Sequence, residues 1–294
     1  MPRKKLSTMA DVTMWLRAAV VILILLVTVL QKPVSRLYTT DTNLPFAFPV
    51  IPFVFAVFNL IGAIILRAIC KKEKPFVPAL ILAIIFVFIN SASSYASSIV
   101  NNFFAANKDM YYIAANSIIC SAIDFVTSPL STTSFAMFFM TAGICVMSKK
   151  PAKILSIIDT ALYGLSLLAT IIITLLQKSL PGYNEDFSFV IPYTALIIAA
   201  FFIIVAAGLI TTASVQDQKK NAGILSGITA IFNICLPFLI LIETILAGRL
   251  GSEVYLAGCV ILNGSLALYN PVPIVALPLF YFTAGVYFSD NLEK

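Results

Sequence analysis

The sequence predicts an all-helical, polytopic membrane protein with eight transmembrane helices, arranged as two parallel four-helix repeats. Composition is the first observation behind this fold class: 60% of the 294 residues are hydrophobic, 11% are charged, and the mean hydropathy is +1.00. Soluble globular domains are nearer 45–50% apolar and about 25% charged. Long apolar segments and recurring phrases are the other two observations. The apolar excess is too large for one core, so the bilayer must be the solvent for most of the surface.

Eight apolar tracts are long enough to cross a hydrocarbon layer of roughly 30 Å, which takes about 20 residues of helix. Runs such as VVILILLVTVL and LLATIIITLL are apolar on every side, whereas the strands of a membrane barrel alternate apolar and polar residues. Helices are therefore expected throughout. In chain order the tracts are Trp15–Gln31, Phe48–Ile69, Phe76–Ser98, Met110–Met147, Ile154–Leu176, Phe189–Thr211, Ile224–Ala247 and Val254–Phe288.

Basic residues set the orientation of these helices, because short cytoplasmic loops carry an excess of lysine and arginine. With eight crossings and a cytoplasmic N-terminus, 14 of the 19 basic residues, Arg17 among them, are assigned to the inner side and 5 to the outer side. Ten crossings reduce this ratio to 11 against 8. We therefore expect eight crossings in the cell (plasma) membrane, with both termini cytoplasmic. The same rule accounts for the net charge of +6, so nucleic acid is not an expected partner.

Two of the tracts are too long for a single crossing. Met110–Met147 has 38 residues, which is roughly 57 Å of helix at 1.5 Å per residue. Each long tract contains proline, in TSPLSTTS around Pro129 and in YNPVP around Pro271, and proline disfavours helix at and just before its own position. We therefore expect the fourth helix of each half to be broken at proline. The first pieces, residues 110–127 and 254–269, either lie along the outer leaflet or enter the membrane as re-entrant segments.

Several phrases occur twice in the same order. FFMTAG returns as FYFTAG 142 positions later, LQK returns after 146 positions, and VIPF returns as VIPY after 140. These matches predict two repeats, residues 1–148 and 149–294. An even number of crossings in each half makes the repeat parallel. Parallel repeats with interrupted helices at matching positions occur in secondary transporters, which bind substrate at the interface between repeats.

Polar residues near the two proline breaks are the candidate substrate-binding groups, since a broken helix frees backbone groups that can bind ions and solutes. The candidates are Asp124, Ser128, Thr132, Thr133, Asn263 and Asn270. Their alternative role is to satisfy the freed backbone. Asp159 and Glu243 are candidate ion or proton sites, or else acids at the membrane interface. Asn90 and Asn233, in the third helix of each half, are expected to form hydrogen bonds between helices.

Composition also argues against several classes of function. The chain has no histidine, its five cysteines form no CxxC pair, and the P-loop, HExxH and GxSxG motifs are absent. We therefore expect no enzymatic activity, no cofactor and no metal site. The predicted function is a small transporter or permease with a site between two pseudo-symmetric halves. The alternative is a non-catalytic membrane subunit, such as a scaffold, receptor or anchor. The expected partner is the lipid bilayer, with other membrane subunits or a second copy of the chain as further candidates.

The topology has a direct test. A reporter fused after Lys294 is expected to lie in the cytoplasm, and a reporter inserted in the PGYNED segment is expected to lie outside the cell. Protease protection or alkaline phosphatase fusions read both positions. The opposite pattern would contradict the eight-crossing arrangement.

Overall fold

The fold is all-helical across the described part of the chain, residues 3–38, 45–106, 110–146, 148–250 and 253–289 of a computed structural model. No strand occurs within those ranges, so the predicted helical class is confirmed. The chain divides into two compact units, each described by itself. The first unit is Met1–Met147 with Ser289–Lys294, and the second is Ser148–Phe288. That the units are repeats of one another stays a prediction.

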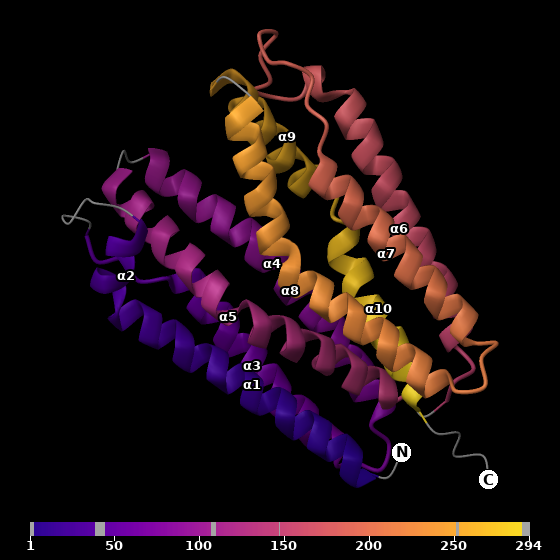
Figure 1. Ribbon diagram of the computed structural model, residues 1–294. Coiled ribbons are helices and arrows are strands. Elements are labelled where there is room, and N and C mark those ends of the chain that lie inside the picture. Colours follow the sequence, from indigo (N-terminus) through magenta and orange to yellow (C-terminus); the bar gives the residue numbers. More distant parts are fainter. Residues whose placement is uncertain (1–2, 39–44, 107–109, 147, 251–252, 290–294) are drawn as a thin grey trace. The chain divides into compact units, whose positions relative to one another are not determined.

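The first unit is built from five helices, drawn from indigo to magenta in Figure 1. They are α1 Arg3–Val29, α2 Gln31–Tyr38, α3 Val50–Cys70, α4 Phe76–Ala106 and α5 Met110–Ile144. The helix α1 packs against both α3 and α5, and α4 also contacts these two helices. An ion pair between Asp11 of α1 and Arg67 of α3 joins the end of α3 to the first turns of α1.

The second unit contains α6 Ala152–Leu175, a short 3-10 turn at Gln177–Ser179, α7 Tyr193–Thr212, α8 Gln218–Leu250, α9 Glu253–Tyr269 and α10 Val272–Phe288. The helix α6 contacts α7, α9 and α10, and α8 contacts α7 and α10. The loops before α6 and α8 lie close together. Burial lowers the pKa of Lys149, nearby Lys219 lowers it further, and Asp217 opposes the change.

Among the described residues, five helices are long and apolar enough to cross a membrane: Leu6–Val29, Val50–Cys70, Phe76–Ser93, Ala152–Leu175 and Tyr193–Thr212. The bent pair α9 and α10 makes a sixth if it is counted as one span. These helices identify an integral membrane protein. The helices α5 and α8 are outside this set, so the predicted eight crossings remain a prediction.

The exposure pattern of α6 agrees with a lipid environment. Six of its seven buried residues are polar, whereas its exposed positions beyond Lys153 are mostly isoleucine and leucine, as at Ile154, Leu165 and Leu175. A helix on the surface of a soluble protein has the opposite pattern, with its apolar stripe turned to the core. An apolar outer face with a polar inner face is stable where the solvent is hydrocarbon.

The predicted break at Pro129 is wrong. The helix α5 continues as one element of 35 residues from Met110 to Ile144, with Pro129 inside it. An internal proline removes one backbone hydrogen bond, whereas ending the helix would leave several backbone groups unpaired, each costing several kcal/mol in hydrocarbon. Hydroxyl groups also pair with the backbone here, since the Thr133 hydroxyl donates to the Pro129 carbonyl at 2.7 Å. Residues 110–127 are therefore the start of α5.

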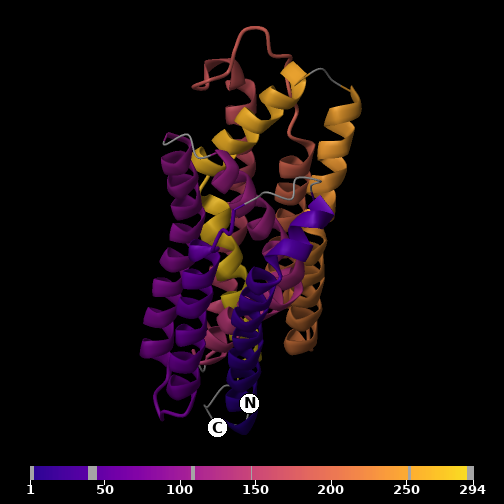
Figure 2. The same cartoon turned by 90° about the vertical axis from the view of Figure 1, so that its left-hand side faces the viewer.

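The predicted break in the last tract is confirmed. The helix α9 ends at Tyr269, α10 begins at Val272, and their axes differ by 59° (Figure 2). Two prolines explain the difference from α5. Pro271 and Pro273 are only two positions apart, and proline is tolerated best in the first turn of a helix. The chain therefore ends one helix before them and starts the next one there.

A buried glutamine follows the first long helix of each unit. The Gln31 side chain accepts a hydrogen bond from the Ala47 amide and donates one to the Pro45 carbonyl, both at 3.1 Å. The Gln177 side chain bonds the amide of Val190 at 2.9 Å and its carbonyl at 3.1 Å. Each glutamine therefore pairs with an extended segment as an adjacent strand would, and satisfies its buried backbone.

The two extended segments enter the next helix in the same way. Pro49 precedes α3 with φ −76° and ψ 69°, and Pro192 precedes α7 with φ −80° and ψ 73°. In the second unit the Tyr183 hydroxyl adds a hydrogen bond to Gln177 Oε1 at 2.6 Å. Burial, followed by nearby Cys259 and Tyr255, raises the pKa of Tyr183, so its hydroxyl keeps the proton that it donates.

Replacing Gln177 with alanine should destabilise the second unit. The change leaves the Val190 amide and carbonyl buried without partners, so we expect the free energy of unfolding to fall by about 2–4 kcal/mol. Denaturant unfolding in detergent measures this loss. Lys178→Ala is the matched control, because Lys178 is adjacent and exposed. Equal stability of the two variants would contradict the role given to Gln177.

Candidate functional site

The first unit contains a partly open cavity of about 220 Å³ lined by residues of α1, α3, α4 and α5. Eight of the residues that line it are polar: Arg17, Asn59, Asn90, Ser93, Asp124, Thr127, Ser131 and Ser134. A water molecule occupies roughly 30 Å³ in the liquid, so the cavity has room for about seven waters or one small solute. Polar groups within an apolar helix bundle mark binding sites and pathways more often than they serve packing.

Arg17 supplies the positive charge of the cavity. It lies midway along the apolar stretch Leu6–Val29 and is only 4% exposed. One of its terminal nitrogens donates to Asn59 Oδ1, and the guanidinium carbon lies 4.9 Å from the centre of the Phe138 ring. Its Nε is buried and has no hydrogen-bond partner among the described residues. The guanidinium is therefore only partly hydrogen-bonded by the described residues.

Two asparagines connect Arg17 to α3 and α4. The Asn59 amide donates to Asn90 Oδ1 at 3.3 Å and to the Phe55 carbonyl at 2.9 Å. The Asn90 amide donates to the Phe86 carbonyl at 2.7 Å. Asn90 therefore forms the expected interhelical bond and also lines the cavity. The chain of amides holds the guanidinium in place without neutralising it.

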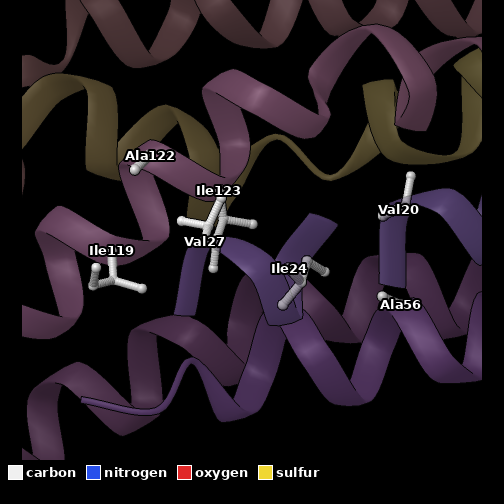
Figure 3. Packing of buried hydrophobic residues seen from close by; sticks show 7 residues of the cluster. All are labelled: Val20, Ile24, Val27, Ala56, Ile119, Ala122 and Ile123. Atoms are coloured by element: carbon white, nitrogen blue, oxygen red, sulfur yellow. The ribbon is translucent and has the colours of Figure 1, made fainter. Parts of the chain in front are cut away.

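Apolar side chains flank the cavity along α1 and α5 in both directions. On the side towards Gln31 lies a cluster from α1, α3 and α5, shown in Figure 3: Val20, Ile24, Val27, Ala56, Ile119, Ala122 and Ile123. On the side of Arg17 lie the rings of Phe86, Phe138 and Phe139, whose neighbouring centroids are 5.1 and 5.2 Å apart. Phe86 packs directly on the α3 backbone at Gly62, where a Cβ atom would lie 2.1 Å from the ring. A polar chamber between two apolar layers can hold a solute away from both sides of the membrane.

Arg17 was missed as a site residue by the sequence analysis, which assigned it to the inner side. Without it the basic residues divide 13 against 5, so the predicted orientation is unchanged. The signal was present in the sequence, since α1 begins at Arg3 and Arg17 is flanked by the apolar runs MWL and AAVVILILL. An arginine with long apolar stretches on both sides is expected inside the membrane.

Of the candidates on α5, only Asp124 lines the cavity. It is exposed as well, which places it at the rim. Ser128, Thr132 and Thr133 are partly exposed and do not line the cavity. The Thr133 hydroxyl donates to the Pro129 carbonyl, four residues earlier in the same helix. Ser131 and Ser134, two hydroxyls of the same segment that were not selected, do line the cavity.

The two asparagine candidates of the second unit differ. Asn263 is exposed on α9. Asn270 is buried at the break and donates to the Ser166 carbonyl, the Ser166 hydroxyl and the Thr170 hydroxyl at 3.0, 3.0 and 3.1 Å. These bonds fasten the break between α9 and α10 to the middle of α6. Asn270 therefore has a structural role that its position in the sequence did not reveal.

The two ion-site candidates also differ. Asp159 is fully buried in α6, two turns from the helix start, and neither carboxyl oxygen has a hydrogen-bond partner among the described residues. Its carboxyl group is therefore enclosed by protein, while its place relative to the membrane interface stays a prediction. Glu243 belongs to α8, but its side chain lies outside the described residues. Asn233 of α8 donates to the Thr229 carbonyl of the same helix, so its expected link between helices stays a prediction.

No known protein family, curated protein or solved structure matches this chain. The described residues hold no cluster of three or more potential metal ligands. The chemistry of the site is therefore taken from its own groups. A buried guanidinium, two amides and several hydroxyls can bind an anionic group and hydrogen-bond the rest of a small polar molecule.

Asn270→Ala should loosen the break. The change removes three hydrogen bonds to α6, so we expect the free energy of unfolding to fall by about 1–3 kcal/mol. Amide hydrogen exchange should rise around residues 266–274. Asn263→Ala is the control, because Asn263 is exposed, and it should leave both quantities unchanged. Equal exchange in the two variants would show that Asn270 does not hold the break.

Proposed function

We propose that the protein is a small-solute transporter whose solute site is the cavity of the first unit. One observation carries the proposal: Arg17, buried at the middle of a membrane-spanning helix, lines a polar cavity and keeps part of its guanidinium unpaired. An arginine at this depth costs several kcal/mol unless water or a partner stabilises it. A scaffold subunit needs apolar packing surfaces and has no use for such a group.

The charge of the site points to a small carboxylate. Guanidinium groups bind carboxylates through two parallel hydrogen bonds, which favours this class of anion over halides. Asp124 at the rim favours a solute that also carries an amine, because a second negative group would be repelled there. The volume sets the size limit at a molecule of a few non-hydrogen atoms. The proposed solute is therefore a small amphoteric carboxylate.

The repeat is part of the proposal. Gln31 and Gln177, which the LQK match pairs, each bond an extended segment that leads into the next helix, and a proline precedes that helix in both units. When the two LQK segments are aligned, with an offset of 146 positions, Arg17 of the first unit corresponds to Tyr163 of the second. The guanidinium of the first unit therefore has no counterpart at that position in the second. We therefore propose two related four-helix halves that have diverged in chemistry, with solute bound in the first.

Accessibility of the cavity distinguishes a transporter from a scaffold. In a background without the five native cysteines, Ser131→Cys should react with a membrane-impermeant thiol reagent applied from either side of sealed proteoliposomes. A transporter exposes its site to each side in turn. Ala136→Cys, buried on the same helix and outside the cavity, should not react. Reaction of Ser131→Cys from neither side, or from one side alone, would refute transport.

The role of Arg17 is tested by binding. Thermal stabilisation of the purified protein by a panel of small amphoteric carboxylates should exceed that by the matching uncharged amides. Arg17→Gln should weaken binding of the best carboxylate at least about tenfold, since a charge-assisted bond contributes about 1.5–3 kcal/mol. Arg67→Gln, a partly exposed arginine paired with Asp11, is the control. Equal affinity in both variants would place the anion site elsewhere.

A further inference from the structure

The inner face of α6 is polar along its whole length. Its buried side chains recur every three or four residues and form the α6 seam, namely Ser156, Asp159, Tyr163, Ser166, Thr170 and Thr174. The seam continues into buried Gln177. At its other end the Ser156 hydroxyl lies 3.4 Å from the Tyr287 hydroxyl of α10. Asp159 is the one acid of this seam, and the proposed solute chemistry makes no use of it.

Asp159 has hydroxyl groups around it and no basic partner. Tyr163 lies one turn further along α6, and its hydroxyl, like that of Thr283 on α10, has no partner among the described residues. The titratable side chains described on α6, besides Asp159, and on the helices that contact α6 (α7, α9 and α10) are Lys153, Tyr163, Tyr193, Tyr255, Cys259, Tyr269, Tyr281 and Tyr287. Lys153 and Tyr193, at the starts of their helices, are exposed.

An ionised carboxylate is not stable in this place. A buried charge without a partner costs far more free energy than a neutral polar group, and the group takes up a proton instead. A metal ion is a poorer substitute, because hard cations require about six oxygen ligands. The backbone groups freed at the break between α9 and α10 do not supply ligands for a metal ion at Asp159, because the break is too far away. Asn270, at the break, bonds α6 at Ser166, which is roughly 10 Å along the helix from Asp159.

We propose that Asp159 is the proton-binding site that couples solute movement to a proton gradient. The carboxylate binds one proton when the seam between α6 and α10 opens to water, and the neutral acid is the form that is buried when the seam closes. The structure described here is then the protonated state. This inference rests on the proposed transport function for its physiological meaning. The binding of the proton itself can be tested without any solute.

Infrared difference spectroscopy of the purified protein in nanodiscs provides that test. Between acidic and alkaline buffers we expect the carbonyl band of a protonated carboxyl group to disappear, with the usual shift in D₂O. The band should be lost in Asp159→Asn and retained in Asp124→Asn. Asp159→Glu keeps a carboxyl group at this position and should show the carbonyl band at a shifted frequency. This variant shows that loss of the band in Asp159→Asn reflects loss of the carboxyl group and not misfolding. A pH-insensitive spectrum, or a band that persists in Asp159→Asn, would overturn the proposal.

Proteoliposomes test the coupling. With the best-binding carboxylate, an imposed proton gradient should drive accumulation by the unmodified protein, and Asp159→Asn should reduce it to the level found without a gradient. Binding of the carboxylate at the Arg17 site should survive in this variant. If that binding is absent from the unmodified protein, the solute proposal fails while the infrared result stands. If binding is intact and accumulation ignores the gradient, the coupling role of Asp159 is refuted.

Discussion

The whole structure depends on one constraint: polar groups in the spanning helices must be paired or enclosed by protein, because lipid cannot hydrogen-bond them. The α6 seam is the clearest case, with hydroxyls inward and isoleucine and leucine outward. The glutamine joints obey the same constraint, since each pairs an extended segment that would otherwise leave its amide and carbonyl unsatisfied. The continuity of α5 through Pro129 follows from it as well.

Function is proposed where this constraint is only partly met. Arg17 has one partner and a remaining unpaired nitrogen beside a cavity, and Asp159 has no partner for either oxygen. Both cost stability in an apolar setting, and neither has its hydrogen-bonding capacity met by the described residues. In these proposals Arg17 binds an anion and Asp159 binds a proton. A transporter driven by a proton gradient requires both kinds of site, although each proposal stands on its own residues.

Sequence reasoning predicted the helices well and the site only in part. Hydropathy locates spans because about twenty consecutive apolar residues are typical of a helix that crosses a bilayer. The segment YNPVP ends a helix because two prolines so close together strongly disfavour a continuous helix there. The role of Asn270 was hidden, since its partners Ser166 and Thr170 are about 100 positions away in the chain. The cavity was hidden for the same reason, because it joins α1, α3, α4 and α5. The position of Arg17 inside an apolar helix, by contrast, could be predicted from the sequence. It was assigned to the inner side instead, when basic residues were counted for orientation.

The central claim is that the first unit holds a hydrated chamber at membrane depth. Hydroxyl-radical footprinting of the unmodified protein in nanodiscs measures this most directly, because oxidation requires water beside the side chain. Phe135 lines the cavity, and Phe139, one turn further along α5, is only 1% exposed. The account predicts rapid oxidation of Phe135 and protection of Phe139. Equal protection of both rings would show that the chamber is dry and would contradict the account.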